Sequence, residues 1–273
     1  MGAIEKATGA AESVQSLVNE AAPVPTIARD LGVADLADAL RAGWADFRAM
    51  PQFGLFFGGF YVAVGLIVGY VSFIGEELSW LIPATAGFPL IAPFVAVGLY
   101  EASRRREAGE ALSWRGVIGA LKGHGDDQIL SMGVIVFVAF GFWTIVAHAI
   151  FAIFMSESGV SAHGGWEMIA ALMTPAGLSM LAIGSIAGAI MAYAFYAMTV
   201  ISLPMLVERK VDFLTAIISS FRAVKHNGFV MLVWAAIIAF VLFAAMVPAF
   251  LGLFVVLPVL GHATWHLYRR VTA

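Results

Sequence analysis

The feature that most constrains this chain is a run of 43 residues, His226 to Tyr268, that contains no Asp, Glu, Lys or Arg. As a single helix it would be about 65 Å long, roughly twice the thickness of the hydrocarbon core of a bilayer. The run must therefore fold back on itself. Pro248 lies near its middle, and a turn there gives two segments of about 20 residues, each long enough to cross a membrane.

Four more apolar runs of membrane-spanning length precede this one, so the sequence predicts six spans. The composition agrees, because 61% of the residues are hydrophobic and only 12% are charged, about half the charged fraction usual in soluble domains. A soluble enzyme is thereby excluded. The four runs are 53–74, 78–100, 129–154 and 175–207.

The positive charges give an independent test of this count. All fifteen Lys and Arg residues fall before the first span, between the second and third, between the fourth and fifth, or after the sixth. Six spans therefore place them all on one side, and the positive-inside rule makes that side and both termini cytoplasmic. We expect a multi-pass membrane protein. The three opposite loops carry Glu76, Glu77, Glu157 and Glu167 as their charged residues.

The first 30 residues are rich in Ala and Glu and contain no apolar segment of the kind found in signal peptides. We expect residues 1–30 to be a mobile cytoplasmic tail. Residues 31–273 are predicted to form a single membrane domain.

An amphipathic stretch on the cytoplasmic side precedes each odd-numbered span. Apolar residues recur there at helical spacing, which predicts three helices lying in the headgroup layer. The predicted fold class is all-α: a polytopic transmembrane helical bundle, with six spans in three hairpins that each follow an amphipathic surface helix. The apolar residues are Leu36, Leu40, Trp44 and Phe47 in the first stretch, with Asp35, Asp38, Arg41 and Asp46 elsewhere on that helix; Trp114, Val117, Ile118 and Leu121 in the second; and Phe213, Leu214, Ile217, Phe221 and Val224 in the third.

Two short similarities suggest that these three units are repeats. The sequence from Phe47 to Met50, with Gly54 after it, resembles the sequence from Phe221 to Val224 with Gly228. A proline also precedes an arginine by eleven residues at 93–104 and again at 258–269. The repeat units expected are 31–106, 107–210 and 211–273, the middle one diverged.

Small residues mark the faces on which the helices are expected to pack. In lipid, the hydrophobic effect does not drive helices together, so they associate mainly through van der Waals packing. Contacts between helices in a membrane therefore favour small side chains that allow close approach. We expect these rows to serve packing within the chain rather than a dimer. They comprise Gly54, Gly58, Gly65 and Gly69 in the first span, and Gly184 and Gly188 in the fourth.

Histidines are the remaining candidates for a metal or haem site, because the chain has no cysteine. His148 lies near the outer end of the third span, whereas His262 and His266 share one helix face near the cytoplasmic end of the sixth. The HxxxH pair lacks the adjacent Glu of a zinc protease. We therefore predict no cofactor, and we interpret His266 with Trp265, Tyr268, Arg269 and Arg270 as a headgroup anchor.

Acidic and basic residues adjoin one another at the cytoplasmic boundary. Such a set could bind a lipid headgroup or a partner, or could be ordinary ion pairing at a membrane surface. The candidate residues are Glu101, Arg104, Glu208, Arg209, Asp212, His262 and His266.

Apart from histidine, no ionisable residue lies deep in a predicted span, which argues against an ion-coupled pump. The sequence contains no usable motif for hydrolysis, phosphate binding or dinucleotide binding. A net charge of -3 gives no reason to expect nucleic-acid binding. We expect a protein that is not an enzyme.

Three strings resemble a known family. They are GFPLIAPFVAVGLYEASRR from Gly87, ISLPMLVERKVDFLTAI from Ile201 and LPVLGHATWHLYRR from Leu257. They are similar to a proteobacterial family of integral membrane proteins, a family of unknown function, over about residues 36–271. The resemblance implies a polytopic inner-membrane protein and supplies no catalytic residues.

The leading hypothesis is a non-enzymatic accessory or assembly component of a membrane complex, with the bilayer and a membrane protein as partners. The alternative is a transporter or channel for a neutral or lipidic solute, whose route the proline-broken helices would line.

Overall fold

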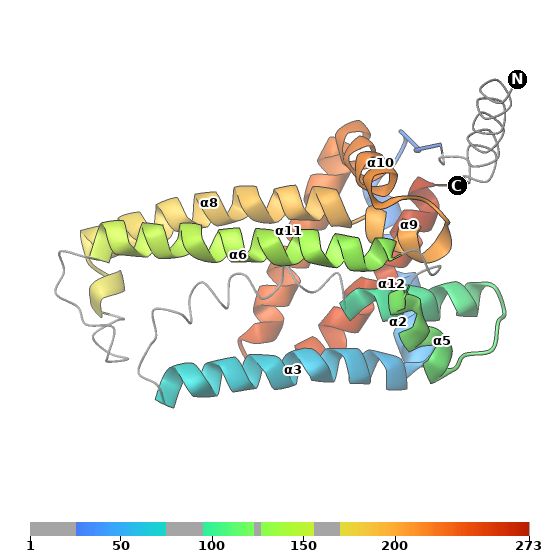
Figure 1. Ribbon diagram of the computed structural model, residues 1–273, viewed down its shortest axis with the longest axis horizontal. Helices are drawn as coiled ribbons and strands as arrows, with labels where there is room; N and C mark the ends of the chain where they lie inside the picture. Colours follow the sequence, from blue (N-terminus) through green and yellow to red (C-terminus); the bar gives the residue numbers. More distant parts are fainter. Residues whose placement is uncertain (1–25, 75–94, 123–126, 156–169, 273) are drawn as a thin grey trace, which may run out of the picture.

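The computed structural model describes residues 26–74, 95–122, 127–155 and 170–272, and this part of the chain is all helical, with no strand (Figure 1). The helices are α2 (Val33–Ala49), α3 (Pro51–Ile74), α5 (Trp114–Gly119), the 3-10 turn η1 (Ala120–Lys122), α6 (Gln128–Met155), α8 (Pro175–Thr199), α9 (Ser202–Glu208), α10 (Phe213–His226), α11 (Gly228–Met246) and α12 (Leu253–Val271). Residues 95–107 are also helical and are called helix 95–107 below.

The long apolar runs form helices close to the predicted bounds. Within the described residues, three stretches are long and apolar enough to cross a membrane: α6, α8 continued by α9, and α11. A fourth would result if α2 and α3, which meet at an angle of 100°, formed one broken span. The count of six is therefore not established by these helices. The predicted second span, 78–100, falls within the described residues only from 95 onward.

The long charge-free run folds back where the sequence predicts. Helix α11 ends at Met246 and α12 begins at Leu253, so Pro248 lies in the turn between them. This turn contains Ala249 and Phe250 at positive φ, which reverses the chain within six residues. Helix α12 is less apolar than the other long helices, because it carries two histidines and ends in Arg269 and Arg270.

The amphipathic stretches predicted at the first and third positions are both helical; their place in the headgroup layer stays a prediction. A single residue separates α2 from α3, and a single residue likewise separates α10 from α11. The apolar face of α10 divides in two: Ala216, Ala223 and Val224 are buried, whereas Leu214 and Phe221 are exposed. The repeat units themselves stay a prediction.

Helix α12 lies at the centre of the packed end of the molecule, against α2 and α3. Its contact with α2 is unusually close, since a Cβ built on Gly43 would lie 2.5 Å from the backbone nitrogen of Ala263. A Cβ on Gly54 of α3 would likewise lie 2.9 Å from the side chain of Pro258. Gly54 belongs to the predicted row of small residues and packs within the chain, whereas Gly69 of the same row has nothing within 4 Å of its Cβ position.

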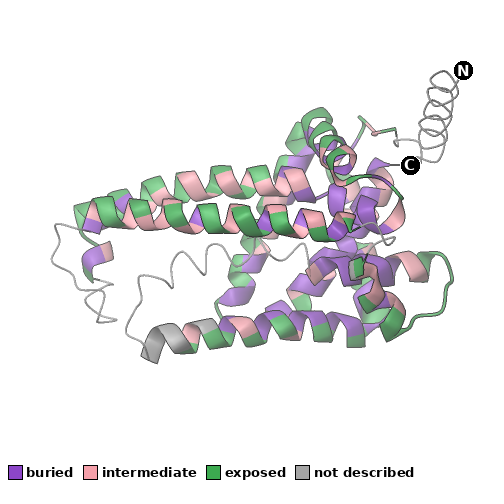
Figure 2. Ribbon diagram, in the orientation of Figure 1, coloured by how far each residue is buried: buried purple, intermediate pink, exposed green. Residues whose placement is uncertain are grey.

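Buried residues are concentrated at one end of the bundle (Figure 2). There α2, α9, α12 and helix 95–107 meet, and Leu203, Trp265 and Tyr268 are almost wholly buried. Along α6 the pattern is the opposite, with Phe137 75% exposed. An exposed aromatic residue in the middle of a long apolar helix is what contact with lipid requires.

Two polar side chains tie separate segments into this end. The Ser220 hydroxyl accepts from Ile201 N and donates to Ala197 O, so it satisfies both backbone groups freed where α8 gives way to α9. The Asn227 side chain accepts from Leu31 N and donates to Ala28 O. Of the predicted tail, residues 1–25 lie outside the described residues.

The Gly43 contact yields a first prediction. Replacing Gly43 with Ala should destabilise the protein by about 1–3 kcal/mol, because the methyl group would meet the backbone of α12. Gly69→Ala is the control, since nothing lies within 4 Å of a Cβ there, and alanine should gain up to about 1 kcal/mol in helix propensity. Thermal unfolding of both variants in detergent would test this; equal midpoints would contradict the close contact.

Candidate functional site

The predicted site residues gather at the buried end of the bundle but do not form one cluster. They join residues that the sequence did not single out, in three groups held mostly by helix 95–107 and α12. We call the whole set the polar layer: Asp46, Glu101, Ser103, Arg104, Arg105, Arg106, Glu107, Glu110, Glu208, Arg209, His262, His266, Tyr268 and Arg269.

The Asp46 carboxylate is the centre of the first group. It is 1% exposed, although the amphipathic pattern had placed Asp46 with the solvent-facing residues of α2, so that prediction is wrong. One carboxylate oxygen accepts from the Arg106 guanidinium. The other accepts from Ser103 Oγ at 2.6 Å and from His266 Nε2 at 2.9 Å. Asp46 therefore joins α2 to helix 95–107 and to α12.

These contacts keep Asp46 ionised. Burial alone would raise the pKa of the Asp46 carboxyl, but the hydrogen bonds from His266 and Ser103 outweigh it and hold the pKa below its usual value. An ionised carboxylate only accepts hydrogen bonds. The Ser103 hydroxyl must therefore donate its single proton to Asp46.

The hydrogen bond to Asp46 fixes the role of His262. Ser103 Oγ lies 2.7 Å from His262 Nδ1 and has already donated its proton, so Nδ1 must carry a proton and donate to Ser103. His262 Nε2 is then an unprotonated acceptor in the neutral ring, and this buried atom has no hydrogen-bond partner in the part of the chain that the structure describes.

This arrangement differs from a hydrolytic triad even though it contains Ser, His and Asp. A nucleophilic serine gives its proton to the histidine, which the aspartate orients from behind. Here Ser103 lies between the two, and its proton points to Asp46 rather than to His262. The group is arranged to join helices rather than to activate the serine.

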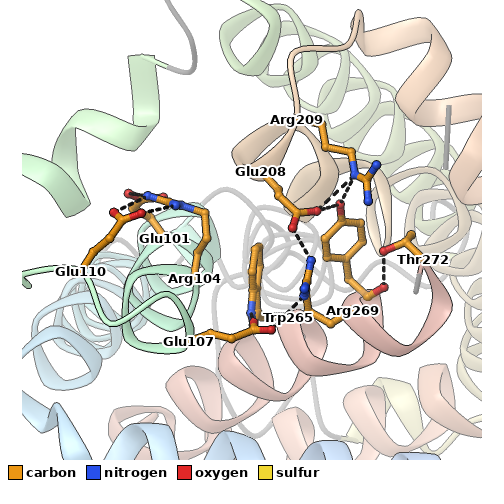
Figure 3. Close-up of polar contacts among 10 residues, drawn as sticks. Glu101, Arg104, Glu107, Glu110, Glu208, Arg209, Trp265, Arg269 and Thr272 are labelled. Carbon is orange, nitrogen blue, oxygen red and sulfur yellow. Dashed lines mark hydrogen bonds and ion pairs between the residues drawn. The ribbon is translucent and has the colours of Figure 1, made fainter. Parts of the chain in front are cut away.

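The second group surrounds Glu101 (Figure 3). Its side chain is 7% exposed and binds Arg104 through both carboxylate oxygens, at 2.7 and 3.0 Å, and Arg105 Nε at 2.6 Å. Glu110 closes the group by accepting two hydrogen bonds from Arg104, which lower the pKa of the Glu110 carboxyl. Glu101 thus holds two guanidinium groups side by side.

The third group surrounds Glu208 at the end of α9 (Figure 3). The carboxylate accepts from the Tyr268 hydroxyl, from Arg269 and, at 3.2 Å, from Arg209 Nε. Arg269 also binds Glu107 at 3.0 Å, and the Trp265 indole donates to Glu107 at 2.9 Å. This group fastens α12 to α9 and to helix 95–107.

Trp265 and Tyr268 correct the prediction of a headgroup anchor. They are 1% and 0% exposed, with ring centroids 5.5 Å apart, so they pack inside the protein rather than at its lipid boundary. The Tyr268 carbonyl also accepts from Thr272 Oγ1 at 2.9 Å. Arg270 pairs with Asp35 and Asp30.

Asp212 belongs to none of these groups. It is the N-cap of α10, where its carboxylate accepts from Thr215 N at 2.8 Å and from the Thr215 hydroxyl. These hydrogen bonds lower the pKa of Asp212 and satisfy a backbone donor that the helix leaves free.

The histidines do not form a metal site in the part of the chain that the structure describes, where no three His, Asp or Glu side chains are grouped as ligands. His148 lies 20 residues along α6 from Gln128, about 30 Å away. Gln128 contacts the start of α10 near the polar layer, through its side-chain oxygen and Phe213 N. His148 and His262 are therefore too far apart to share a haem.

Sequence reasoning missed Asp46, Ser103, Arg106 and Glu107. One signal was available: Asp46 lies one residue before Phe47 and three after Gly43, both of which are buried. A residue between two buried neighbours on a helix points partly inward. Ser103 and Arg106 carried no such signal, because their partners come from segments more than 50 residues away.

The Asp46 contacts yield a second prediction. Asp46→Asn should cost about 3 kcal/mol of stability, because it turns one acceptor into a donor and leaves Arg106 without its partner. Asp38→Asn on the same helix is the control. Its ion pair with Arg41 is largely exposed, so its loss should change stability by less than about 0.5 kcal/mol. Similar unfolding midpoints for the two variants would show that Asp46 is not a structural centre.

Comparisons with known proteins bear on this chain at the level of the family. No curated protein and no solved structure matches it. A family model described as "Predicted integral membrane protein (DUF2189)" matches residues 81–208, which include helix 95–107 and run through α9. Over these residues the chain is similar to an uncharacterised family of integral membrane proteins, which confirms the resemblance predicted from its sequence.

Proposed function

We propose that the protein is a non-enzymatic accessory or assembly component of a complex in the bacterial inner membrane, with six spans and both termini in the cytoplasm. The observation that carries this proposal is an apolar groove in the membrane-spanning part of the bundle, whose shape and lining suit a helix of a partner protein.

The apolar groove consists of two adjoining cavities of about 370 and 360 Å³. They share Ala189, Ala192, Ala239 and Phe243, so they form one continuous surface between α8 and α11. Helix α6 contributes to one end and α12 to the other. The lining from Met180 to Thr199 covers 20 residues of α8, about 30 Å, which is the thickness of a bilayer core.

Small residues form much of the groove. Helices associate in lipid where small side chains let two backbones approach closely, and the groove has such residues on both walls. On the α8 wall Gly188 leaves room for Trp143, which would lie 3.0 Å from a Cβ at that position. The small residues are Gly184, Gly188, Ala189 and Ala192 on α8, and Ala236 and Ala239 on α11.

The polar layer supports a role outside catalysis. Its carboxylates and guanidinium groups bind one another and hold α2, α9, α12 and helix 95–107 together. Their hydrogen bonds are thus used for packing between helices. The polar layer thus serves as a rigid frame for the apolar groove.

Movement or storage of a lipidic solute is the second candidate, and the same cavities favour it. The groove is apolar along its length, and Tyr193 and Tyr196 stack 5.8 Å apart beside it. An acyl or isoprenoid chain would fit such a surface as well as a helix would.

A photocrosslinker in the groove separates these functions and provides the third prediction. Benzoylphenylalanine at Ala192, which lines both cavities, should form one discrete adduct with a second protein in native membranes. The same group at Phe137, which faces outward from α6, is the control and should give no discrete protein adduct.

Other products would contradict the accessory role. Lipid adducts at Ala192 without a protein adduct would favour the lipidic carrier. An adduct within the chain itself, to the predicted second span, would mean that the groove is an internal packing surface.

The fourth prediction concerns the orientation of the protein in the membrane. Because the chain has no cysteine, a single introduced cysteine provides the only thiol that can be labelled. In intact spheroplasts a membrane-impermeant maleimide should label Val247→Cys, which lies in the exposed turn after α11, and should not label Lys225→Cys on α10. Both should react once the membrane is permeabilised. Labelling of Lys225→Cys in intact cells would overturn the six-span topology.

A further inference from the structure

A polar cavity of about 420 Å³ lies beside the polar layer and is separate from the apolar groove, with which it shares no lining residue. We call it the arginine pocket, because arginines from two segments line it: Arg104 and Arg105 on helix 95–107, and Arg115 on α5. Glu101 and Glu208 line it as well, so the side chains of the pocket carry a net charge of +1.

The two arginines of helix 95–107 are held in place, and one of them keeps free donors. Arg104 directs its hydrogen bonds to Glu101 and Glu110. Arg105 gives Nε to Glu101 and Nη1 to Ala111 O, with Glu110 3.7 Å from Nη1, which leaves Nη2 without a partner among the described residues. A guanidinium fixed in this way loses little side-chain entropy when it binds an anion.

Arg115 is the one arginine of the pocket without an ion pair or hydrogen bond to any described residue. Its whole guanidinium is therefore available to a ligand. The carboxylates of Glu101 and Glu110 are each paired with both Arg104 and Arg105. The positive charge that remains uncompensated in the pocket is thus that of Arg115.

Glycines keep the wall of the pocket open. A Cβ on Gly116 would lie 2.6 Å from Cζ of Arg105, so the guanidinium rests on the bare backbone of α5. Gly119 has nothing within 4 Å of its Cβ position, which leaves open space one turn further along. Any side chain at 116 would move Arg105, and a long one at 119 would enter the cavity.

The pocket also lies at the level where a membrane surface is expected. Glu208, part of its lining, is the last residue of the candidate span Pro175–Glu208. Trp114, adjacent to Arg115, packs on Phe53 and Phe56 at the start of α3, with ring centroids 4.5 and 5.2 Å away. Tryptophan is enriched where apolar spans meet the headgroups.

We propose that the arginine pocket binds a phosphate group, with Arg115 and Nη2 of Arg105 as donors to its oxygens. Arginine pairs with phosphate in a planar, charge-assisted geometry, and basic pockets at the cytoplasmic ends of membrane helices bind anionic headgroups. The phosphate belongs to the headgroup of an anionic lipid or to a soluble phosphate compound. This inference is independent of what fills the apolar groove.

The test uses the full chain purified in neutral detergent and titrated with cardiolipin, phosphatidylglycerol, phosphatidylcholine or sodium pyrophosphate, with the unfolding midpoint as the readout. An anionic phosphate ligand should raise the midpoint. A rise with the two anionic lipids, and a smaller one with phosphatidylcholine, would identify a headgroup site. A rise with pyrophosphate would identify a soluble ligand.

Two variants show whether the effect arises in the pocket. Arg115→Gln should raise the apparent Kd about tenfold, the loss expected for one charge-assisted contact of about 1.4 kcal/mol. Gly116→Ala should also weaken binding by displacing Arg105. Arg222→Gln is the matched control, since Arg222 is an exposed arginine on α10 at the same end of the molecule, and it should leave the Kd within twofold. No midpoint rise with any compound, or equal losses for Arg115→Gln and Arg222→Gln, would overturn the proposal.

Discussion

The fold at the packed end of this protein depends on one buried carboxylate. Removing a charged carboxylate from water costs several kcal/mol unless donors surround it, and Asp46 has donors from two other segments. The geometry of these hydrogen bonds determines which surfaces of α2, α12 and helix 95–107 face one another. The close approach at Gly43 brings α2 near enough to α12 for these hydrogen bonds to form.

The polar layer and the apolar groove are two consequences of the same arrangement. At the polar end, ion pairs and hydrogen bonds satisfy the charged side chains within the protein, so the helices there are fixed relative to one another. Beyond it, small residues of α8 and α11 line an open apolar surface. A rigid end joined to an open groove is suited to holding a membrane-embedded partner in a defined position.

Much of the fold could be predicted because a membrane span is recognised by the length of an apolar run and by the absence of charged residues within it. The bounds of α6, and those of α8 taken together with α9, follow from runs without charged residues, and the turn at Pro248 follows from a run too long to cross once. The break between α8 and α9 was not predicted. The ion pair of Glu101 with Arg104 was also accessible, since the two residues are three apart on one helix.

The centre of the candidate site could not be predicted, for a physical reason. In the sequence, Asp46 looks like any other polar residue of an amphipathic helix. Its burial depends on Arg106 and His266, which are 60 and 220 residues away. The same holds for Glu208, whose partners Tyr268 and Arg269 come from another helix. Local spacing describes one face of one helix, whereas these contacts depend on how three helices pack.

The central claim is that the protein works as a component of a larger membrane assembly, and gentle purification from native membranes tests it most directly. Mass spectrometry of the purified sample should identify one partner at a fixed stoichiometry, and that partner should be lost when Ala192→Trp fills the groove. A chain that purifies alone in its native form, with or without bound lipid, would contradict the account.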